Sequence, residues 1–419
     1  MSTVVGRTRD PFVDVLRTCA ILVVACGHWI MPVLARHGAT LTASNALATP
    51  GWWLLTWPLQ VMPVFFFAGG AANHHSYAAG GDPRRWLAQR LGRLAVPVLP
   101  LLAVWLVLPE VLHGLGLPAQ PVALASGIVG QLLWFLAVYV LTVVAVPLTH
   151  RWGLPMVAVL GVAALGVDAL RFDGLPLVGY VNELLVWLAI SRLGAAYASN
   201  QLRPSRAVAM GVAGFAGTAL LILFGHYPDS MVGLPGQAVS NMAPATTCLL
   251  TLGIGQIGVL LALREPILRW AVRPGQARLL TAVGRRCMTV YLWHMPALVV
   301  VAGVAVLGFG YATPPPGSPM WLVVTPLWIA ALTATLSVLV RIFGRFETVA
   351  PVSGAPSARR LAVAVPLLCA GCAGIAVFGF ADVGVAVLWS AAVVVGLCLA
   401  RPAGVTVRWL AAAMDAIFR

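Results

Sequence analysis

Arg17 and His28 are ionisable residues within the first long apolar run of this 419-residue chain. An ionisable group at the centre of a membrane helix costs about 2.5–3.5 kcal/mol, so residues of this kind indicate a functional site. On a helix the eleven-residue step between them is about 1100°, close to three full turns. Both side chains therefore share one face, about 16–17 Å apart along the axis. Asp14, three residues before Arg17, lies on nearly the same stripe and can pair with it.

His28 is the residue of this stripe that can move a proton, because the pKa of an ordinary histidine lies near neutral pH. It could deprotonate a hydroxyl as a general base. Arg17 stays protonated, so we expect it to stabilise negative charge rather than transfer a proton. The structural alternative for His28 is a neutral histidine that only makes a hydrogen bond inside a helix bundle.

The composition is that of a polytopic membrane protein. Hydrophobic residues make up 60% of the chain and charged residues 9%, and the mean hydropathy is +0.94. A soluble domain usually has about 25% charged residues. The net charge of +14 does not indicate a nucleic-acid partner, because the arginines lie in short clusters between apolar stretches. The seven cysteines fall in or at the ends of these stretches, so we expect no metal site.

Apolar windows of about 20 residues divide the chain into twelve candidate spans. We therefore predict an all-α polytopic membrane protein, with the last two spans joined as a tight hairpin. The windows are 13–35, 51–72, 94–114, 127–148, 154–170, 176–197, 206–225, 243–263, 287–309, 321–343, 361–380 and 383–400.

The arginines predict the orientation of these spans. With the N-terminus in the cytoplasm, 24 of the 26 arginines lie on the cytoplasmic side, and only Arg36 and Arg171 lie outside. This asymmetry follows the positive-inside rule and fits an even number of spans. We expect a multi-pass protein of the plasma membrane with both termini in the cytoplasm.

Five segments resemble, in the same order, the motifs of the acyltransferase-3 family of integral membrane acyltransferases. Ala68-Gly69 replaces the usual Ser-Gly of the second motif, which the resemblance implies to be a turn. The segments are Asp14-Val-Leu-Arg17 with Gly27-His28, Phe65-Phe-Phe-Ala-Gly-Gly70, Arg90-Leu-Gly-Arg93 with Pro97, Leu133-Trp-Phe-Leu136 and Tyr291-Leu-Trp-His294-Met-Pro296.

The resemblance implies a ten-helix acyltransferase core at residues 10–345. Residues 346–419 then form a C-terminal segment with an additional transmembrane hairpin. The implied reaction moves an acyl group from acyl-CoA, at the cytoplasmic side, to a hydroxyl of a carbohydrate, lipid or secondary metabolite. His28 would act as general base or as a transient acyl carrier.

The implied site residues fall into three groups. His28, Arg17 and Asp14 form the catalytic group. The donor group comprises Arg90 and Arg93, whose guanidinium groups can grip the phosphates of CoA, together with His294 and His74. The acceptor group is Glu183, Trp134 and Asn241. For most of these residues a purely structural role, as a membrane anchor, packing residue or solvated side chain, is the alternative.

Two other functions remain open at this stage. Twelve spans with buried Arg, His and Glu also suit a proton-coupled transporter or exporter, and an inactive family member could serve as a membrane scaffold. Release of CoA from acyl-CoA would distinguish the enzyme from the transporter. The expected partners are acyl-CoA, a hydroxyl-bearing glycan, lipid or small molecule, membrane lipid and a second copy of the chain in a homodimer.

Overall fold

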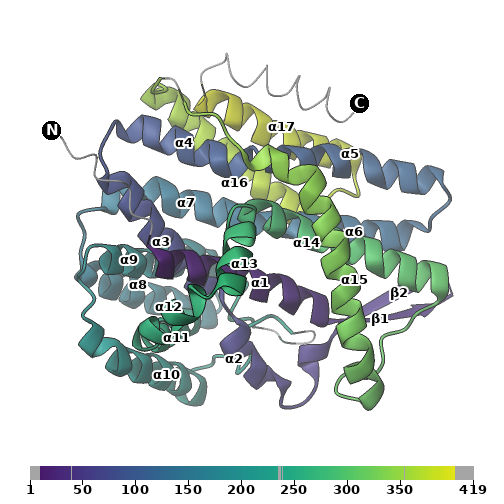
Figure 1. The fold of residues 1–419 in the computed structure, drawn as a ribbon, viewed down its shortest axis with the longest axis horizontal. Helices are drawn as coiled ribbons and strands as arrows, with labels where there is room; N and C mark the ends of the chain where they lie inside the picture. The colour runs from purple at the N-terminus through teal and green to yellow at the C-terminus, as the bar shows by residue number, and fades with distance from the viewer. Residues whose placement is uncertain (1–9, 39, 235–236, 238, 353, 402–419) are drawn as a thin grey trace. The chain divides into compact units, whose positions relative to one another are not determined.

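The computed structural model describes residues 10–38, 40–234, 237, 239–352 and 354–401, and Figure 1 shows their arrangement as ribbons. Eleven helical stretches of this part are long and apolar enough to cross a membrane. A bent pair of helices, Thr247–Ala262 and Arg264–Ala271, meets at 66° and can supply a twelfth. Every predicted window overlaps one of these twelve stretches, so the all-α polytopic fold is confirmed. Four of the arginines that predict the orientation lie outside the described residues, namely Arg7, Arg9, Arg408 and Arg419.

The predicted end of the first span is wrong. Helix α1 runs from Pro11 to Ile30, and residues that we assigned to its end form strand β1, Pro32–His37. This strand pairs antiparallel with β2, Thr40–Asn45, from Pro32 opposite Asn45 to His37 opposite Thr40. Pro32 explains the break, because proline has no backbone N–H and disfavours helical backbone in the residue before it.

The predicted turn at Phe65–Gly70 is also wrong, because this segment lies inside helix α3, Met62–Ala78. The same helix carries His74 and His75 near its C-terminal end. Helix α3 packs against α9, Asn182–Ala198. A Cβ atom at Gly70 would overlap the backbone of Ser191, and one at Gly194 would overlap the backbone of Phe67. The small residues therefore permit a close helix crossing instead of a turn.

Contacts divide the chain into two compact units, and the boundary falls inside α1 between Val24 and Ala25. The first unit combines the chain up to Val24 with Pro50–Ala78 and Thr149–Cys287. Beside α3 and α9 it contains η2 (Trp52–Leu55), α2 (Thr56–Leu59), α8 (Leu154–Phe172), η3 (Pro176–Val181), η4 (Pro204–Arg206), α10 (Ala207–Phe224), α11 (Thr247–Ala262), α12 (Arg264–Ala271) and α13 (Pro274–Gly284).

The second unit combines Ala25–Thr49, Ala79–Leu148 and the chain from Met288 onward. With β1 and β2 it contains η1 (Ala46–Ala48), α4 (Pro83–Ala95), α5 (Val98–Gly114), α6 (Ala119–Gln131), α7 (Leu133–Thr149), α14 (Cys287–Ala302), the π-helix η5 (Gly303–Gly308), α15 (Pro319–Phe343), η6 (Gly344–Glu347), α16 (Ala358–Phe378) and α17 (Val383–Ala400).

The C-terminal hairpin of α16 and α17 packs against α4 and α6 in this second unit (Figure 1). Arg401, directly after α17, is buried, and it donates a hydrogen bond of 2.6 Å to the carbonyl of Ala350. Its guanidinium group lies against Gly92 of α4. The division into a 10–345 core and a 346–419 segment stays a prediction.

Candidate active site

His28 and His294 form a direct pair in the second unit. Nδ1 of His28, in the last turn of α1, lies 2.9 Å from Nε2 of His294 in the middle of α14. The two rings are stacked, with centroids 5.2 Å apart and planes inclined by 17°. His294 is fully buried, whereas His28 remains partly exposed.

The neighbours of the pair determine where its hydrogens lie. Nδ1 of His294 is 2.6 Å from the carbonyl oxygen of Tyr291, which can only accept, so this nitrogen carries a hydrogen. In the neutral ring Nε2 of His294 is then an acceptor, and Nδ1 of His28 donates to it. Nε2 of His28 is left with its lone pair. The arrangement presents this nitrogen as a base whose ring is held by a hydrogen bond on the opposite side.

Two further contacts fix the backbone around the pair. The indole Nε1 of Trp29 donates to the carbonyl of His294 at 2.9 Å. The carbonyl of Trp29 in turn accepts from Nε1 of Trp328, on α15, at 3.0 Å. Helices α1, α14 and α15 are therefore connected by hydrogen bonds at the level of the pair.

Helix α7 supports the other side of α14. The Tyr291 hydroxyl donates to the carbonyl of Leu132, and its ring meets Phe135 edge to face at 5.2 Å. The structure thus joins the predicted segments that contain His294 and Trp134. Trp134 itself is partly exposed and packs against its neighbour Phe135.

Gly27, the residue before His28, lies on an open part of the helix surface, where an added Cβ atom would meet no described atom within 4 Å. His28 itself is partly exposed.

Arg17 and Asp14 form the predicted ion pair one turn apart on α1, with an N–O distance of 3.2 Å. The side chains are 31% and 39% exposed, so the pair is partly solvated and contributes little to stability. Nε of Arg17 is buried and has no hydrogen-bond partner among the described residues. The guanidinium group therefore has donor capacity left for a ligand.

Arg90 and Arg93 lie on the amphipathic helix α4 of the second unit. The guanidinium of Arg90 stacks over Trp86 at 5.7 Å, and Arg93 is exposed. Asp82 caps this helix by accepting from the backbone N–H groups of Arg84 and Arg85. The hydrogen bond from Arg84 is the main reason why the pKa of Asp82 is lowered.

The remaining predicted residues lie in the first unit. His74 is half-buried on α3, within electrostatic reach of Arg192, His75 and His150. Glu183 accepts from the indole of Trp187 at 2.8 Å and from the backbone of Ala245 at 2.9 Å.

Asn241 belongs to the same unit and is fully buried. It donates to the carbonyls of Pro228 and Ser230 and accepts from the Thr246 hydroxyl. The side chains of Glu183 and Asn241 thus form hydrogen bonds within the protein. Asn241 lies in the loop between α10 and α11, and Glu183 on α9 accepts from Ala245 of the same loop.

Sequence reasoning missed Asp168, a fully buried acid on α8. It accepts hydrogen bonds from Asn182, the Tyr227 hydroxyl and the backbone N–H of Thr247, at 2.8, 3.0 and 2.7 Å. Burial and the nearby Asp168 carboxylate raise the pKa of Tyr227. An acid inside the apolar run Leu154–Phe172 was the available signal.

The described residues contain no group of three or more His, Cys, Asp or Glu side chains arranged to hold a metal ion. Comparison with protein families matches residues 10–343 to the acyltransferase family 3 model, described as an acyltransferase domain. Comparisons with curated proteins and with solved structures gave no match. The family match covers most of the chain and includes both α1 and α14. The chain therefore belongs to acyltransferase family 3 and is a membrane enzyme that transfers acyl groups.

Proposed function

We propose that the protein transfers an acyl group from acyl-CoA to a hydroxyl of a carbohydrate, lipid or small-molecule acceptor, with His28 as general base. The observation that carries this proposal is the hydrogen-bonded series Tyr291 carbonyl–His294–His28. It directs the lone pair of His28 Nε2 away from His294. A base of this kind typically contributes 10²–10⁴-fold to the rate.

In the proposed reaction Nε2 of His28 takes the proton of the acceptor hydroxyl while its oxygen attacks the thioester carbonyl. The new C–O bond forms, the C–S bond breaks, and the imidazolium returns the proton to the CoA sulfur. His294 holds the ring during both transfers, because its Nε2 accepts from His28 Nδ1 in the neutral and the protonated state. The same geometry also permits transient acylation of Nε2.

We assign the binding of the acyl donor, acyl-CoA, to three arginines. Arg17 lies about 16–17 Å from His28 along α1, too far to contact a thioester that reacts beside His28. Its unpartnered Nε fits a phosphate or amide of the extended CoA instead. Arg90 and Arg93 on α4 are the proposed phosphate contacts, since guanidinium groups form charge-assisted, bidentate bonds with phosphate. Asp14 orients Arg17.

The other predicted roles stay predictions: His74 near the donor, Trp134, Glu183 and Asn241 near the acceptor, a possible homodimer, and a plasma-membrane location with both termini in the cytoplasm. The hydrogen bonds of Glu183 and Asn241 favour loop positioning over direct contact with an acceptor.

The test is CoA release from acetyl-CoA by the purified protein, with a membrane lipid and glycan extract as the acceptor source. We expect His28→Ala to lower kcat at least 100-fold. His294→Phe keeps a buried ring but removes the acceptor for His28 Nδ1, so kcat should fall about tenfold with little change in KM for acetyl-CoA. His113→Ala, an exposed histidine on α5, is the matched control. Turnover near that of the wild type in folded His28→Ala would contradict the proposal.

A further inference from the structure

Helix α4, which carries Arg90 and Arg93, packs against the C-terminal hairpin. Its neighbours include α16 and α17 of the hairpin, besides α5, which continues α4 in sequence. The family match ends at residue 343, whereas the hairpin begins at Ala358. The placement of two arginines of the family motif therefore depends on elements that the match does not include.

Hydrogen bonds join α4 to the segment that precedes the hairpin. Nε of Arg85 donates to the carbonyl of Val352 at 3.0 Å, and the backbone N–H of Val352 donates to Oε1 of Gln89 at 2.7 Å. Arg401, directly after α17, donates to the carbonyl of Ala350 at 2.6 Å. The same short segment is thus held by the first half of α4 and by the end of the hairpin.

Arg401 lies against Gly92, which separates Arg90 from Arg93 on α4. A Cβ atom at Gly92 would come within 3.2 Å of Nη1 of Arg401 and within 3.3 Å of its Cδ and Cζ. The missing side chain at Gly92 therefore gives the guanidinium group its room. The group lies on the backbone of the stretch that carries the two family arginines.

The charge of Arg401 is not balanced by an acid. Arg401 is 3% exposed, it forms no ion pair with a described acid, and its Nε has no hydrogen-bond partner among the described residues. A buried charge without a partner is costly. Three arginines on or against one stretch of α4 create a positive field, which a bound phosphate group would offset.

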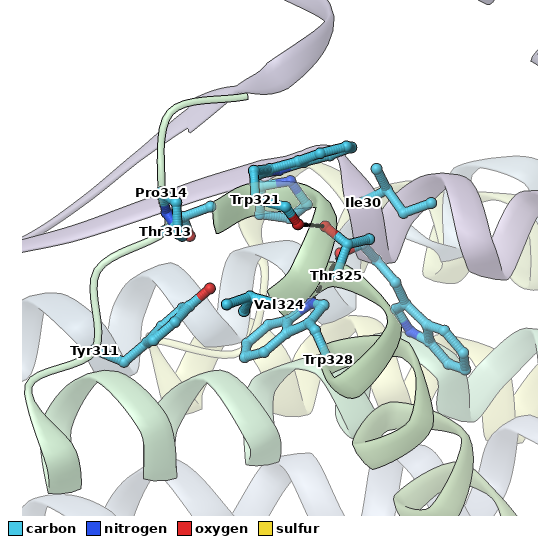
Figure 2. A pocket seen from close by; sticks show the side chains of 10 residues that line it. Ile30, Tyr311, Thr313, Pro314, Trp321, Val324, Thr325 and Trp328 are labelled. Atoms are coloured by element: carbon cyan, nitrogen blue, oxygen red, sulfur yellow. Dashed lines mark hydrogen bonds between the residues drawn. The ribbon is translucent and has the colours of Figure 1, made fainter. Parts of the chain in front are cut away.

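The pocket beside the start of α15 has no such field. Figure 2 shows its lining, which includes Tyr311, Trp321 and Trp328. All ten lining residues are uncharged, so a phosphate would find no cation among them. A donor that carries phosphates is better matched by α4.

We propose that the C-terminal hairpin belongs to the donor site, with Arg401 as a positioning residue. Arg401 holds the stretch of α4 that carries Arg90 and Arg93, and its charge adds to theirs, so the phosphate groups of the donor bind more tightly. Because Arg401 is buried, it acts through α4 and through its field and not by contact with the donor. The inference rests on the proposed function, which assigns the phosphates of acyl-CoA to Arg90 and Arg93.

The test compares two acyl donors, with the full chain in phosphatidylcholine nanodiscs. Acetyl-CoA carries phosphates and S-acetylpantetheine carries none, so only the first depends on the arginines of α4. We expect Arg401→Ala to raise KM for acetyl-CoA about tenfold, with little change in kcat and an unchanged kcat/KM for S-acetylpantetheine. Arg401→Lys keeps the charge but loses the planar guanidinium group, and its KM should lie between the two. Arg359→Ala, at an exposed arginine of the same hairpin, is the matched control.

Gly92→Ala is an independent variant that keeps Arg401. Its added Cβ atom displaces the guanidinium group, while alanine itself favours the helix. We expect the Kd for CoA, measured by calorimetry, to rise about threefold with no loss of melting temperature.

The outcomes separate this inference from the proposed function. An unchanged KM in Arg401→Ala together with an unchanged Kd in Gly92→Ala overturns the inference. An equal loss with both donors does so too, because it would show a purely structural role. If Arg401→Ala fails to fold or S-acetylpantetheine is not turned over, the Kd of Gly92→Ala decides. In each case the proposed function survives if CoA release depends on His28; if His28→Ala releases CoA as fast as the wild type, both conclusions fail.

Discussion

Asp168 shows how an acid is accommodated inside the first unit. Its carboxylate accepts from three neutral donors, those of Asn182, Tyr227 and Thr247, which come from three different segments. A buried charge needs such hydrogen bonds, because each unsatisfied polar group costs about 1–3 kcal/mol. The acid therefore ties α8 to the start of α9, to the loop after α10 and to the N-terminus of α11.

We expect Asp168→Ala to lower the thermal stability of the purified protein markedly, because three donors lose their acceptor. Asp168→Asn keeps one accepting oxygen, so its effect should be smaller. Asp173→Ala, an exposed acid just after α8, should change stability by less than about 0.5 kcal/mol. Unfolding can be followed with a thiol-reactive dye, since the seven cysteines are free and at least partly buried. Equal melting temperatures for Asp168→Ala and Asp173→Ala would rule out the structural role.

At the scale of elements, the crossing of α3 and α9 depends on two glycines. Gly70 and Gly194 each face the backbone of the other helix at a distance that leaves no room for a Cβ atom. Phe66 and Trp187 stack beside this crossing, with centroids 4.6 Å apart. Small residues that bring backbones together are a general means of packing helices in membranes.

Gly194→Val should therefore force the two helices apart and reduce the yield of folded protein in detergent. Gly166→Ala on α8 is the control, since no described atom lies within 4 Å of the added Cβ and alanine favours the helix. The measurement is the monodisperse fraction on size-exclusion chromatography together with the melting temperature. A Gly194→Val protein as stable as the wild type would show that the crossing tolerates separation.

For the whole molecule, the arginine distribution predicts the cytoplasmic side. Arg84 lies in the first turn of α4 on that side, and Asp173 follows α8 on the opposite side; both are exposed. We expect a membrane-impermeant maleimide to label Asp173→Cys in intact cells, and Arg84→Cys only after permeabilisation. The wild type, with its seven cysteines in or near the spans, gives the background. The reverse labelling pattern would invert the predicted topology.

The sequence predicted the spans well because hydrophobic length alone determines them. It failed where a local residue overrides the apolar pattern, as Pro32 does in ending α1 at Ile30, five residues before the predicted end of the span at residue 35. The turn predicted at Phe65–Gly70 was also wrong. Gly70 serves helix packing against α9, and that contact is not visible from the sequence because α9 begins more than 100 residues later.

The candidate site was predictable in part. The resemblance singled out His28 and His294 separately, and their spacing of 266 residues gave no sign that the rings touch. The hydrogen bond between Trp328 and Trp29 was beyond reach for the same reason, because the two residues approach each other only in the folded chain. Asp168 was different, since an acid within an apolar run could have been recognised from sequence.

The loop before α15 and the histidine pair come from different stretches of the polypeptide. The loop comprises residues 311–318, whereas His28 and His294 belong to α1 and α14. Strand β1 holds this loop through two hydrogen bonds between Leu34 and Thr313. Because neither bond involves a histidine, the loop can be exchanged for a sequence of another length or composition while the contact between the two imidazole rings is preserved.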